Sequence, residues 1–597
     1  MASPTNNLGH SHSRTSTSPE SVTETLQVPE SFNEKPAGAE GPKGIQAVKK
    51  GRDFWLSFLA MIVSIFLSAL DLTSVGTALP TIADALNDTE GNYVWVGSAY
   101  ALSSTAIMPL SGSLSDAFGR KPVMLVSIAL FALGSALAGA AQDMNMMIGA
   151  RTVQGLGGGG IINLVEILIS DLVALSERGT YQGLIGLTWS FASAIAPPIG
   201  GALSDRGRTA WRWLFYLNLP LTGMAFILVL FFLNVRTPPG TVKEKLNKVD
   251  WFGNVIVICG TTLAIIGLTW GGIRYDWTDK HVLAPLIIGF ALLVAFGWYE
   301  VKVPVKPTIP SDLLMNRTTL SAILMTAMHG ITSICADSIL LTRRGCSFSP
   351  SRLAHSSIPV FFQSAFGASP IRSAVDFLPS ALIIAPFALS SGFVVAITGK
   401  YRPVNWIGWA LTMIGFGCLS LLKADTSTGK WVGYQLVVSA GSGLVFSAPV
   451  FPLLAPQPIS RTASALALFA FTRAFTQTWG ITIGSTILQN KLKINLPASY
   501  LATFPAGHEI AYAAIPGIPK LAEPLRTEVM VAFAESMKVV WQTMVGISGA
   551  GFLFSLLMQE VEMVGVVDET FALQARPEQE TPNNARDAEK AVPPTES

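Results

Sequence analysis

The stretch Gly112-Ser-Leu-Ser-Asp116-Ala-Phe-Gly119-Arg120-Lys121-Pro122 places one acid, two bases and two glycines between two long apolar segments. Residues 94–114 before it and 123–141 after it are each long enough to cross a bilayer core, which takes roughly 20 helical residues. The stretch therefore predicts a hairpin of two membrane-spanning helices with a charged connection at its tip.

The composition of the whole chain agrees with a polytopic membrane protein. Of its 597 residues, 50% are hydrophobic and only 13% are charged, with a mean hydropathy of +0.47. A soluble domain carries roughly 25% charged residues. The net charge of +2 comes without a long block of Lys or Arg, so nucleic acid is not an expected partner. Four cysteines, two of them inside apolar spans, predict no disulfide framework.

Apolar runs recur from Phe54 onward with short polar gaps between them. A window of membrane-spanning length predicts about fourteen helices, at residues 54–79, 94–114, 121–141, 145–171, 180–203, 212–234, 251–271, 282–300, 318–336, 374–397, 403–422, 430–453, 462–488 and 541–559. The polar ends, 1–52 and 563–597, are too poor in apolar residues to bury a core and are predicted to be disordered cytosolic tails.

Basic residues predict the orientation of these helices. With the amino terminus inside, the segments that would face the cytosol hold most of the Lys and Arg between the spans, as the positive-inside rule requires. A cluster of Arg206, Arg208 and Arg212 on the outer side weakens that assignment. The same topology puts the sequon Asn87-Asp88-Thr89 outside, so Asn87 is a candidate for glycosylation, although it lies close to the membrane.

A weak internal repeat divides the chain into two halves. The segment from Gly392 to Arg402 lies between two later spans as Gly112–Pro122 does in the first half, and it keeps a glycine and two bases but lacks the acid. Symmetry of this kind is expected of transporter halves. The predicted units are a six-helix half at 53–235, a linker with two extra spans at 236–310, and a second six-helix half at 311–562.

Two segments of the second half depart from this pattern. Residues 335–357 bring an acid, three arginines and many serines into a predicted span, and arginines at the membrane centre are costly. We interpret this segment as a translated intron or similar gene-model error; a genuine outer loop is the alternative. Residues 489–540 form a long outer loop with five prolines, in which Leu525 to Val540 is predicted to be a helix lying on the outer leaflet or on the bundle.

The opening stretch resembles the signature loop of the major facilitator superfamily, G-x-L-[SA]-D-x-x-G-R-K/R. The match includes Gly112, Leu114, Ser115, Asp116, Gly119, Arg120 and Lys121. The resemblance implies a fold of two six-helix halves, here with two inserted helices as in the fourteen-helix drug:proton antiporters. It also implies that the loop is a conformational latch, braced by Asp171 and Arg178 at the inner end of the next helices.

Three ionisable residues inside apolar spans are candidates for proton coupling. Asp71 lies in Leu70-Asp71-Leu-Thr73, which resembles the first-helix motif of these antiporters, and Arg151 opens the pattern R-x-x-Q-G in the fourth span. Intramembrane charges are functional by default, but Asp71 and Arg151 are also expected to pair structurally. Glu166 is fifteen positions beyond Arg151, or about 22 Å along a helix. It is either a second protonatable site or a charge at the cavity rim.

The fifth span resembles the antiporter motif g-x8-G-x3-G-P-x2-G-G, which marks exporters in this superfamily. It is carried by Gly183, Ala192, Ala196, Pro197, Gly200 and Gly201, with alanine at two glycine positions. Small residues and a proline favour a kinked, closely packed helix that pivots at the interface between the halves. Asp376, His329 and Arg473 are further polar residues of later spans that belong to no motif.

The resemblance implies a proton-coupled antiporter that exports small, largely apolar organic compounds by alternating access. The expected partners are the compound, protons and the lipid bilayer, with no cofactor, no metal and a monomeric state. The plasma membrane is the expected location, with the vacuolar membrane as an alternative. A vacuolar carrier of basic amino acids or a siderophore-iron carrier shares this fold. A transport-inactive membrane sensor or a defective gene product is the alternative of another class. No phosphate-binding loop or catalytic constellation indicates an enzyme.

Overall fold

The structure is a computed structural model that describes residues 50–87, 94–204, 206–207, 209–272, 275–303, 307–310, 312–337, 357–368, 370–458, 461–504, 510 and 514–563. The chain divides into two units, Met1–Lys50 and Gly51–Ser597, and the helices all belong to the second. The predicted tails lie almost wholly outside the described residues, as does the anomalous segment apart from its two ends.

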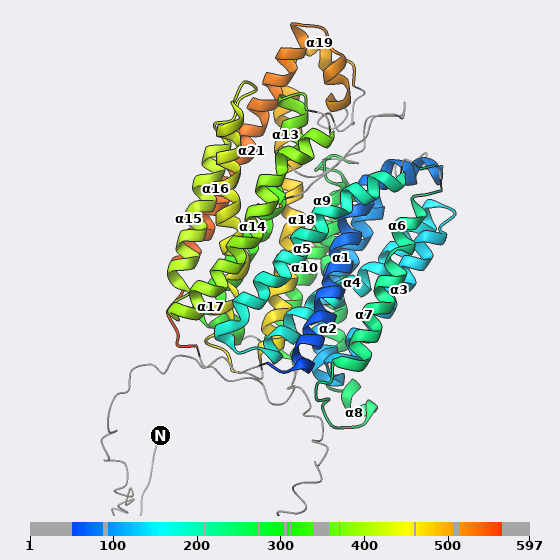
Figure 1. Cartoon of the computed structure of the whole chain (residues 1–597), viewed down its shortest axis with the longest axis vertical. Helices are drawn as coiled ribbons and strands as arrows, with labels where there is room; N and C mark the ends of the chain where they lie inside the picture. Colours follow the sequence, from blue (N-terminus) through cyan, green and yellow to red (C-terminus); the bar gives the residue numbers. More distant parts are fainter. Residues whose placement is uncertain are drawn as a thin grey trace, which may run out of the picture. The chain divides into compact units, whose positions relative to one another are not determined.

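Seven helices make up a first bundle (Figure 1). They are α1 (Arg52–Ala85), α2 (Val94–Phe118), α3 (Arg120–Ala140), α4 (Met144–Leu172), α5 (Leu175–Ser204), α6 (Arg212–Tyr216) and α7 (Asn218–Phe232). α4 packs against both α2 and α3, and α5 packs along α1. Small residues allow this close packing, since a Cβ at Gly157 would meet the backbone of Phe131 and a Cβ at Gly159 would meet that of α2.

A short connecting helix and two long helices follow. They are α8 (Val242–Leu246), which begins with a capping box on Thr241, then α9 (Trp251–Trp270) and α10 (Lys280–Lys302). α9 and α10 pack tightly on each other, with Gly260 and Gly267 of one helix against the other. α9 also contacts α2 and α18, so the pair is attached to both bundles.

The remaining helices form a second bundle (Figure 1). They are α11 (Asp312–Met315), α12 (Arg317–Asp337), α13 (Ser357–Ala365), α14 (Pro370–Thr398), α15 (Arg402–Leu419), α16 (Thr428–Ser447), α17 (Val450–Leu454), α18 (Thr462–Asn495), α19 (Ala498–Leu501), the 3-10 helix η2 (Ile515–Lys520) and α21 (Leu525–Leu556). Among the described residues no strand occurs beyond an isolated bridge between Gly271 and Tyr275.

The all-helical membrane architecture predicted from sequence is confirmed. Nine helices of the described part are long and apolar enough to cross a membrane. Five further helices of 18 to 34 residues, α2, α5, α12, α15 and α18, are not among these nine. The total of fourteen spans therefore stays a prediction.

Two predicted boundaries were wrong. The long outer loop expected at 489–540 is shorter, because α18 continues to Asn495 and α21 already begins at Leu525. The helix expected at 525–540 is the first half of α21, and its buried Val529, Phe533 and Met537 pack into a cluster with α13 and α16 residues. Burial of this apolar face favours continuing the helix rather than ending it at the membrane surface.

The charged connection of the opening stretch is also shorter than expected. α2 runs through Asp116 to Phe118 and α3 starts at Arg120, so the connection is Gly119 alone. Gly119 has φ +93°, a conformation that other residues rarely adopt. The ends of α2 and α4 and the starts of α1, α3 and α5 lie at the same end of the first bundle, here called the Gly119 end, which the sequence predicts to be cytosolic.

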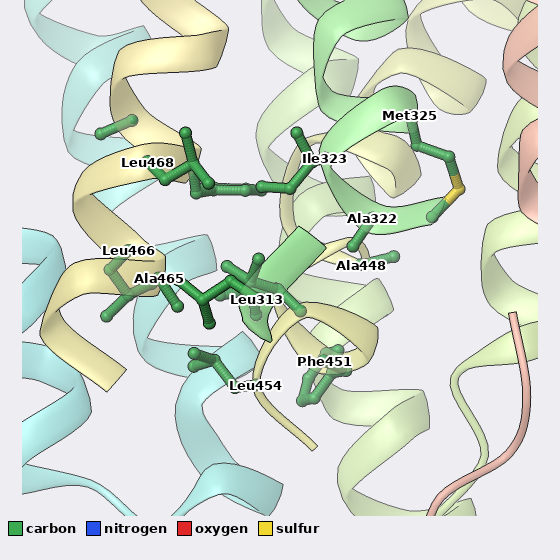
Figure 2. Packing of buried hydrophobic residues seen from close by; sticks show 14 of the residues in the cluster. Leu313, Ala322, Ile323, Met325, Ala448, Phe451, Leu454, Ala465, Leu466 and Leu468 are labelled. Atoms are coloured by element: carbon green, nitrogen blue, oxygen red, sulfur yellow. The ribbon is translucent and has the colours of Figure 1, made fainter. Parts of the chain in front are cut away.

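The two bundles meet at the Gly119 end. A buried apolar cluster joins Met108, Ile167 and Leu175 of the first bundle to residues of α11, α12, α17 and α18. Figure 2 shows part of it, with Leu313 lying among side chains of α17 and α18. Close contacts between helix backbones add to the cluster, since Gly112 lies beside Ala467 and Gly183 beside Leu389. The Gly119 end is therefore closed by packing between the bundles.

The last described segment is tied to the second bundle. The Tyr401 hydroxyl donates to the backbone oxygen of Gln559 and accepts from the amide of Val561, while Glu560 accepts from the Tyr401 amide at 3.1 Å. Burial raises the pKa of this hydroxyl to about 12, so it keeps its proton at neutral pH. The chain after α21 is thus fixed to the start of α15.

Candidate functional site

Asp71 lies at the centre of a buried polar network inside the first bundle. Its Oδ2 accepts from Arg151 Nη1 at 2.5 Å. Its Oδ1 accepts from Gln154 Nε2 at 2.9 Å and from Asn218 Nδ2 at 2.7 Å. Asp71 is 1% exposed. α1, α4 and α7 thus meet at one carboxylate, which the amide and guanidinium groups compensate in a region closed to solvent.

Arg151 is equally enclosed, with 0% of its surface exposed. Besides Asp71 it donates from Nε to the Val96 carbonyl at 2.9 Å and from Nη1 to Gln154 Oε1 at 2.6 Å. Its guanidinium lies 4.5 Å from the ring centroid of Tyr100, a cation–π contact. The predicted pairing of Asp71 with Arg151 is therefore present.

Gln154 and Asn218 extend this network, and only Gln154 was marked by the sequence pattern. Both side chains also reach Ser135 Oγ of α3, at 2.8 Å and 3.4 Å. An asparagine at the start of α7 gives no periodic or motif signal, because its role depends on how α7 packs beside α1 and α3. Together these amides satisfy the Asp71 oxygen that does not face Arg151.

The predicted latch residues form a second network at the Gly119 end. Arg120 is 1% exposed; its Nε donates to Asp171 Oδ2 at 2.8 Å and its Nη1 to Asp116 Oδ1 at 2.7 Å. The same nitrogen reaches the Ser115 carbonyl at 2.9 Å. One guanidinium therefore links the end of α2 to the end of α4 across the turn at Gly119.

Lys121 and Arg178 bind neighbouring chain ends. Lys121 Nζ donates to Asn234 Oδ1 at 3.0 Å, just after α7. Arg178 donates from Nε to the Val173 carbonyl at 2.9 Å and from Nη2 to the Ser170 carbonyl at 2.5 Å. These are carbonyls at the end of α4, where a cation is favoured by the helix dipole.

Glu166 belongs to neither network and faces the second bundle. It is 8% exposed, and its Oε2 accepts a hydrogen bond from Gln182 Nε2 of α5. Its carboxylate interacts through its charge with Arg473 of α18. Glu166 and Arg151 both lie on α4, fifteen positions apart, and the sequence did not indicate Arg473 or Gln182 as neighbours of Glu166.

The residues of the fifth-span motif fall into two groups. Gly183 lies against α14 of the other bundle, where a Cβ would be 2.6 Å from Leu389 Cα. Ala192 and Ala196 are fully buried and pack with Ala69 and Leu70 of α1, next to Asp71. Pro197, Gly200 and Gly201 lie further along the same helix. The first part of the motif therefore lies between the bundles.

Asn87 lies at the exposed end of α1 with φ +51°, and the rest of its sequon is outside the described residues. In the described part, no group of three or more His, Cys, Asp or Glu side chains is arranged to hold a metal ion.

The comparisons with known proteins identify the family. The sequence profile of the Major Facilitator Superfamily matches residues 61–481. The efflux pump FUS6 of Gibberella fujikuroi is 36% identical over 544 residues, which is 90% of this chain and 94% of the pump. The MFS-type efflux pump LUC4 of a Fusarium species is 35% identical, covering 89% and 92% of the two chains.

A third efflux pump is similar to the same extent. The MFS-type efflux pump MMF1 of Pseudozyma antarctica is 34% identical over 89% of this chain and 95% of the pump. Among solved structures, the human organic anion transporter MFSD10 superposes with a TM-score of 0.52 at 14% identity, covering 85% of this chain and 100% of that one. At that identity the likeness concerns the fold.

Proposed function

The chain belongs to the Major Facilitator Superfamily, and from this premise we propose that it exports small, largely apolar organic compounds in exchange for protons. It is an integral membrane transporter of small molecules. The observation that carries the proposal is the similarity, at 34–36% identity over about nine tenths of the chain, to proteins named efflux pumps. Another relative at 35% identity is named as the transporter of an acurin A biosynthesis cluster, which supports secondary metabolites as cargo.

Alternating access supplies the mechanism. Packing between the bundles closes the Gly119 end, which the basic residues predict to be cytosolic. An exporter is closed on its cytosolic side after it has taken up its cargo. The return to the loading state requires α5 to separate from α14 and α2 from α18. The Arg120 network joins the ends of α2 and α4, which supports a role in holding these two helices in one arrangement.

Proton coupling is assigned to Asp71 with Arg151, and Glu166 is the second proton site. Asp71 is compensated by Arg151 while both are buried, so a proton can replace the guanidinium only when the network opens. Such a site couples a charge change to a rearrangement of α1, α4 and α7. Glu166 lies where the two bundles meet, since it interacts with the charge of Arg473 on α18.

The test is efflux from a fungal host that lacks its own drug pumps, loaded with a panel of fluorescent drugs and fungal metabolites. Expression of the chain lowers the retained compound, and a protonophore abolishes the effect. Asp71→Asn abolishes gradient-driven efflux while the protein remains in the membrane. Efflux that survives the protonophore contradicts proton coupling, and efflux retained by Asp71→Asn contradicts its assignment. Accumulation of arginine or ferric chelates instead of drug efflux supports a vacuolar or siderophore carrier.

Location is tested separately, with a fluorescent tag on the carboxyl terminus. We propose the plasma membrane, because a compound exported there leaves the cell. Signal confined to the vacuolar membrane contradicts this. The same tagged protein provides the expression control for every variant below, and its size-exclusion profile tests the proposed monomeric state.

A further inference from the structure

Arg473 is a half-buried cation whose hydrogen-bonding capacity is only partly used. Its Nη2 donates to the Phe446 carbonyl at 3.0 Å, near the end of α16. Its Nε is buried and has no partner among the described residues. An unsatisfied buried N–H is costly, and a guanidinium in a membrane protein needs a compensating acceptor. The printed hydrogen bond uses one of the five N–H groups of the guanidinium, so the site has further charged donors to offer to an incoming group.

Two aromatic rings flank this guanidinium. The Arg473 Cζ lies 4.4 Å from the ring centroid of Phe469 and 4.6 Å from that of Phe446. Cation–π contacts hold the planar group in place, and the rings give an apolar surface beside it. Both features suit a ligand with an apolar body and an anionic or acceptor group.

The charges around Arg473 come from both bundles. Glu166 is its opposite charge, and among the described residues the two groups interact through space without a direct ion pair. His329 of α12 is 4% exposed, packs its ring edge-on against Phe446 at 6.3 Å and also interacts with the Arg473 charge. A cation thus faces a carboxylate across the interface between the bundles, without being neutralised by contact.

The position of Arg473 also marks a change along α18. The helix is buried on all sides from Ala465 to Phe471, but every residue from Thr472 to Trp479 is partly exposed. α18 contacts α2 and α4 of the first bundle as well as α12 and α21 of its own. Arg473 therefore lies just beyond the packed Gly119 end, on a helix shared by both bundles.

We propose that Arg473 is the recognition residue for an anionic group, such as a carboxylate, on the exported compound, and that Glu166 competes with that group for the guanidinium. This inference rests on the proposed export function and narrows its cargo from apolar compounds in general to amphipathic organic acids. The planar fork binds a carboxylate through two parallel hydrogen bonds, and Phe446 and Phe469 contact the apolar body. Once a carboxylate occupies Arg473, Glu166 loses the opposite charge that acts on it among the described residues.

The experiment compares two fluorescent probes of equal size, 1-pyrenebutyric acid and its primary amide. Full-length protein in proteoliposomes exports both, and the initial rate is measured against concentration. The wild type is expected to prefer the acid. Arg473→Gln lowers acid export about tenfold or more, since a charge-assisted hydrogen-bond pair is lost, and changes amide export less than about twofold. Lys493→Gln, which removes an exposed cation from the same helix, is the control and changes neither probe.

Two further variants separate recognition from folding. Arg473→Lys keeps the charge but not the planar fork, so its acid export lies between those of the wild type and Arg473→Gln. Glu166→Gln removes the competing carboxylate. Because Glu166 is also the proposed second proton site, the maximal rate falls for both probes, but the KM for the acid falls relative to that for the amide. An unchanged ratio of the two KM values in Glu166→Gln contradicts the competition between the two carboxylates.

Three results overturn the inference. Equal export of acid and amide by the wild type shows that the anion is not recognised. A parallel loss of both probes in Arg473→Gln shows that Arg473 supports the bundle and does not bind cargo. If the wild type exports neither probe but exports members of the drug panel, the anionic class is wrong and the proposed export function stands; if it exports no compound at all, both fail.

Discussion

At the residue scale, the pair formed by Asp71 and Arg151 determines what can be expected of the first bundle. Both side chains are almost fully enclosed and bonded to each other at 2.5 Å. Removing one member of a buried pair leaves the other charge uncompensated, which costs about 3–5 kcal/mol, whereas removing both costs less than the sum. The two side chains therefore act as one unit in stability, whatever their part in transport.

A double-mutant cycle tests this coupling. Asp71→Asn and Arg151→Gln are each expected to lower the free energy of unfolding by several kcal/mol, and the double variant to recover about 2 kcal/mol of their sum. The measurement is reversible unfolding in mixed detergent micelles. Additive losses would contradict the coupling. Because the double variant lacks the carboxylate but leaves neither charge uncompensated, its efflux separates proton coupling from the effect of an unpaired buried charge.

Individual residues were predictable where a motif or an isolated intramembrane charge marked them. Asp71, Arg151 and Arg120 stand out in apolar surroundings, and the structure places Asp71 beside Arg151 and Arg120 beside Asp116 and Asp171. Asn218 and Gln182 were missed because a single asparagine or glutamine in an apolar span gives no motif signal. Their roles depend on helix packing, which no local pattern specifies.

At the element scale, α4 depends on its glycines. A Cβ at Gly157 would lie 2.8 Å from Phe131 Cα and 2.5 Å from the Ser127 carbonyl oxygen, both in the backbone region of α3, which cannot move aside as a side chain can. Gly149 in the same helix has nothing within 4 Å of such a Cβ. The two positions therefore separate the effect of packing from the effect of glycine on helix propensity.

Gly157→Ala is expected to lower the free energy of unfolding by about 1–3 kcal/mol through overpacking. Gly149→Ala, the matched control, is expected to raise it by about 0.4–1 kcal/mol, because alanine restricts the unfolded chain. The temperature at which each tagged protein aggregates in detergent ranks the wild type, Gly157→Ala and Gly149→Ala by stability. A Gly157→Ala protein as stable as the wild type would show that α3 and α4 are farther apart than described.

The proposed latch also acts between helices, because Arg120 joins the end of α2 to the end of α4. Arg120→Lys keeps the charge but cannot reach Asp116 and Asp171 with separate nitrogens of one planar group. We expect efflux to fall about tenfold with normal membrane expression. Lys423→Gln, a change at an exposed cation outside both networks, is expected to leave efflux unaltered. Equal efflux in Arg120→Lys and the wild type would remove the latch assignment.

Helix positions followed from apolar length, but helix ends did not. Spans such as 94–114 and 145–171 correspond to α2 and α4 within a few residues. α21 began sixteen residues before the predicted start at 541, because the polar residues of Leu525–Val540 dilute its apolar content, while packing against α13 and η2 stabilises it as helix. A hydropathy window detects membrane crossing and does not detect helices that continue beyond it.

At the scale of the whole transporter, the packing between the bundles decides which side is open. The bundles are in contact near the Gly119 end through Gly112 beside Ala467 and Gly183 beside Leu389, together with the apolar cluster of α11, α12, α17 and α18. The sequence predicted two related halves from the repeat at 392–402, but not their conformation. The proposed alternating access requires one sequence to adopt two states, so no single motif can encode which of them is seen.

Gly183→Ala is expected to shift this equilibrium away from the closed Gly119 end. The added Cβ would be 2.6 Å from Leu389 Cα on α14, and the two helices must separate to admit it. Gly223→Ala in α7 is the matched control, since nothing lies within 4 Å of its Cβ.

Labelling of a single cysteine measures the shift. With the four natural cysteines replaced, Thr476→Cys places a thiol on the partly exposed stretch of α18. In the wild-type background a membrane-impermeant maleimide reaches it from the side opposite the Gly119 end. Gly183→Ala lowers that labelling rate severalfold and raises labelling from the Gly119 side, whereas Gly223→Ala leaves both rates unchanged. Because the two helices touch only when the Gly119 end is closed, an unchanged labelling pattern in Gly183→Ala would mean that α5 and α14 stay together in both states and that the bundles pivot elsewhere.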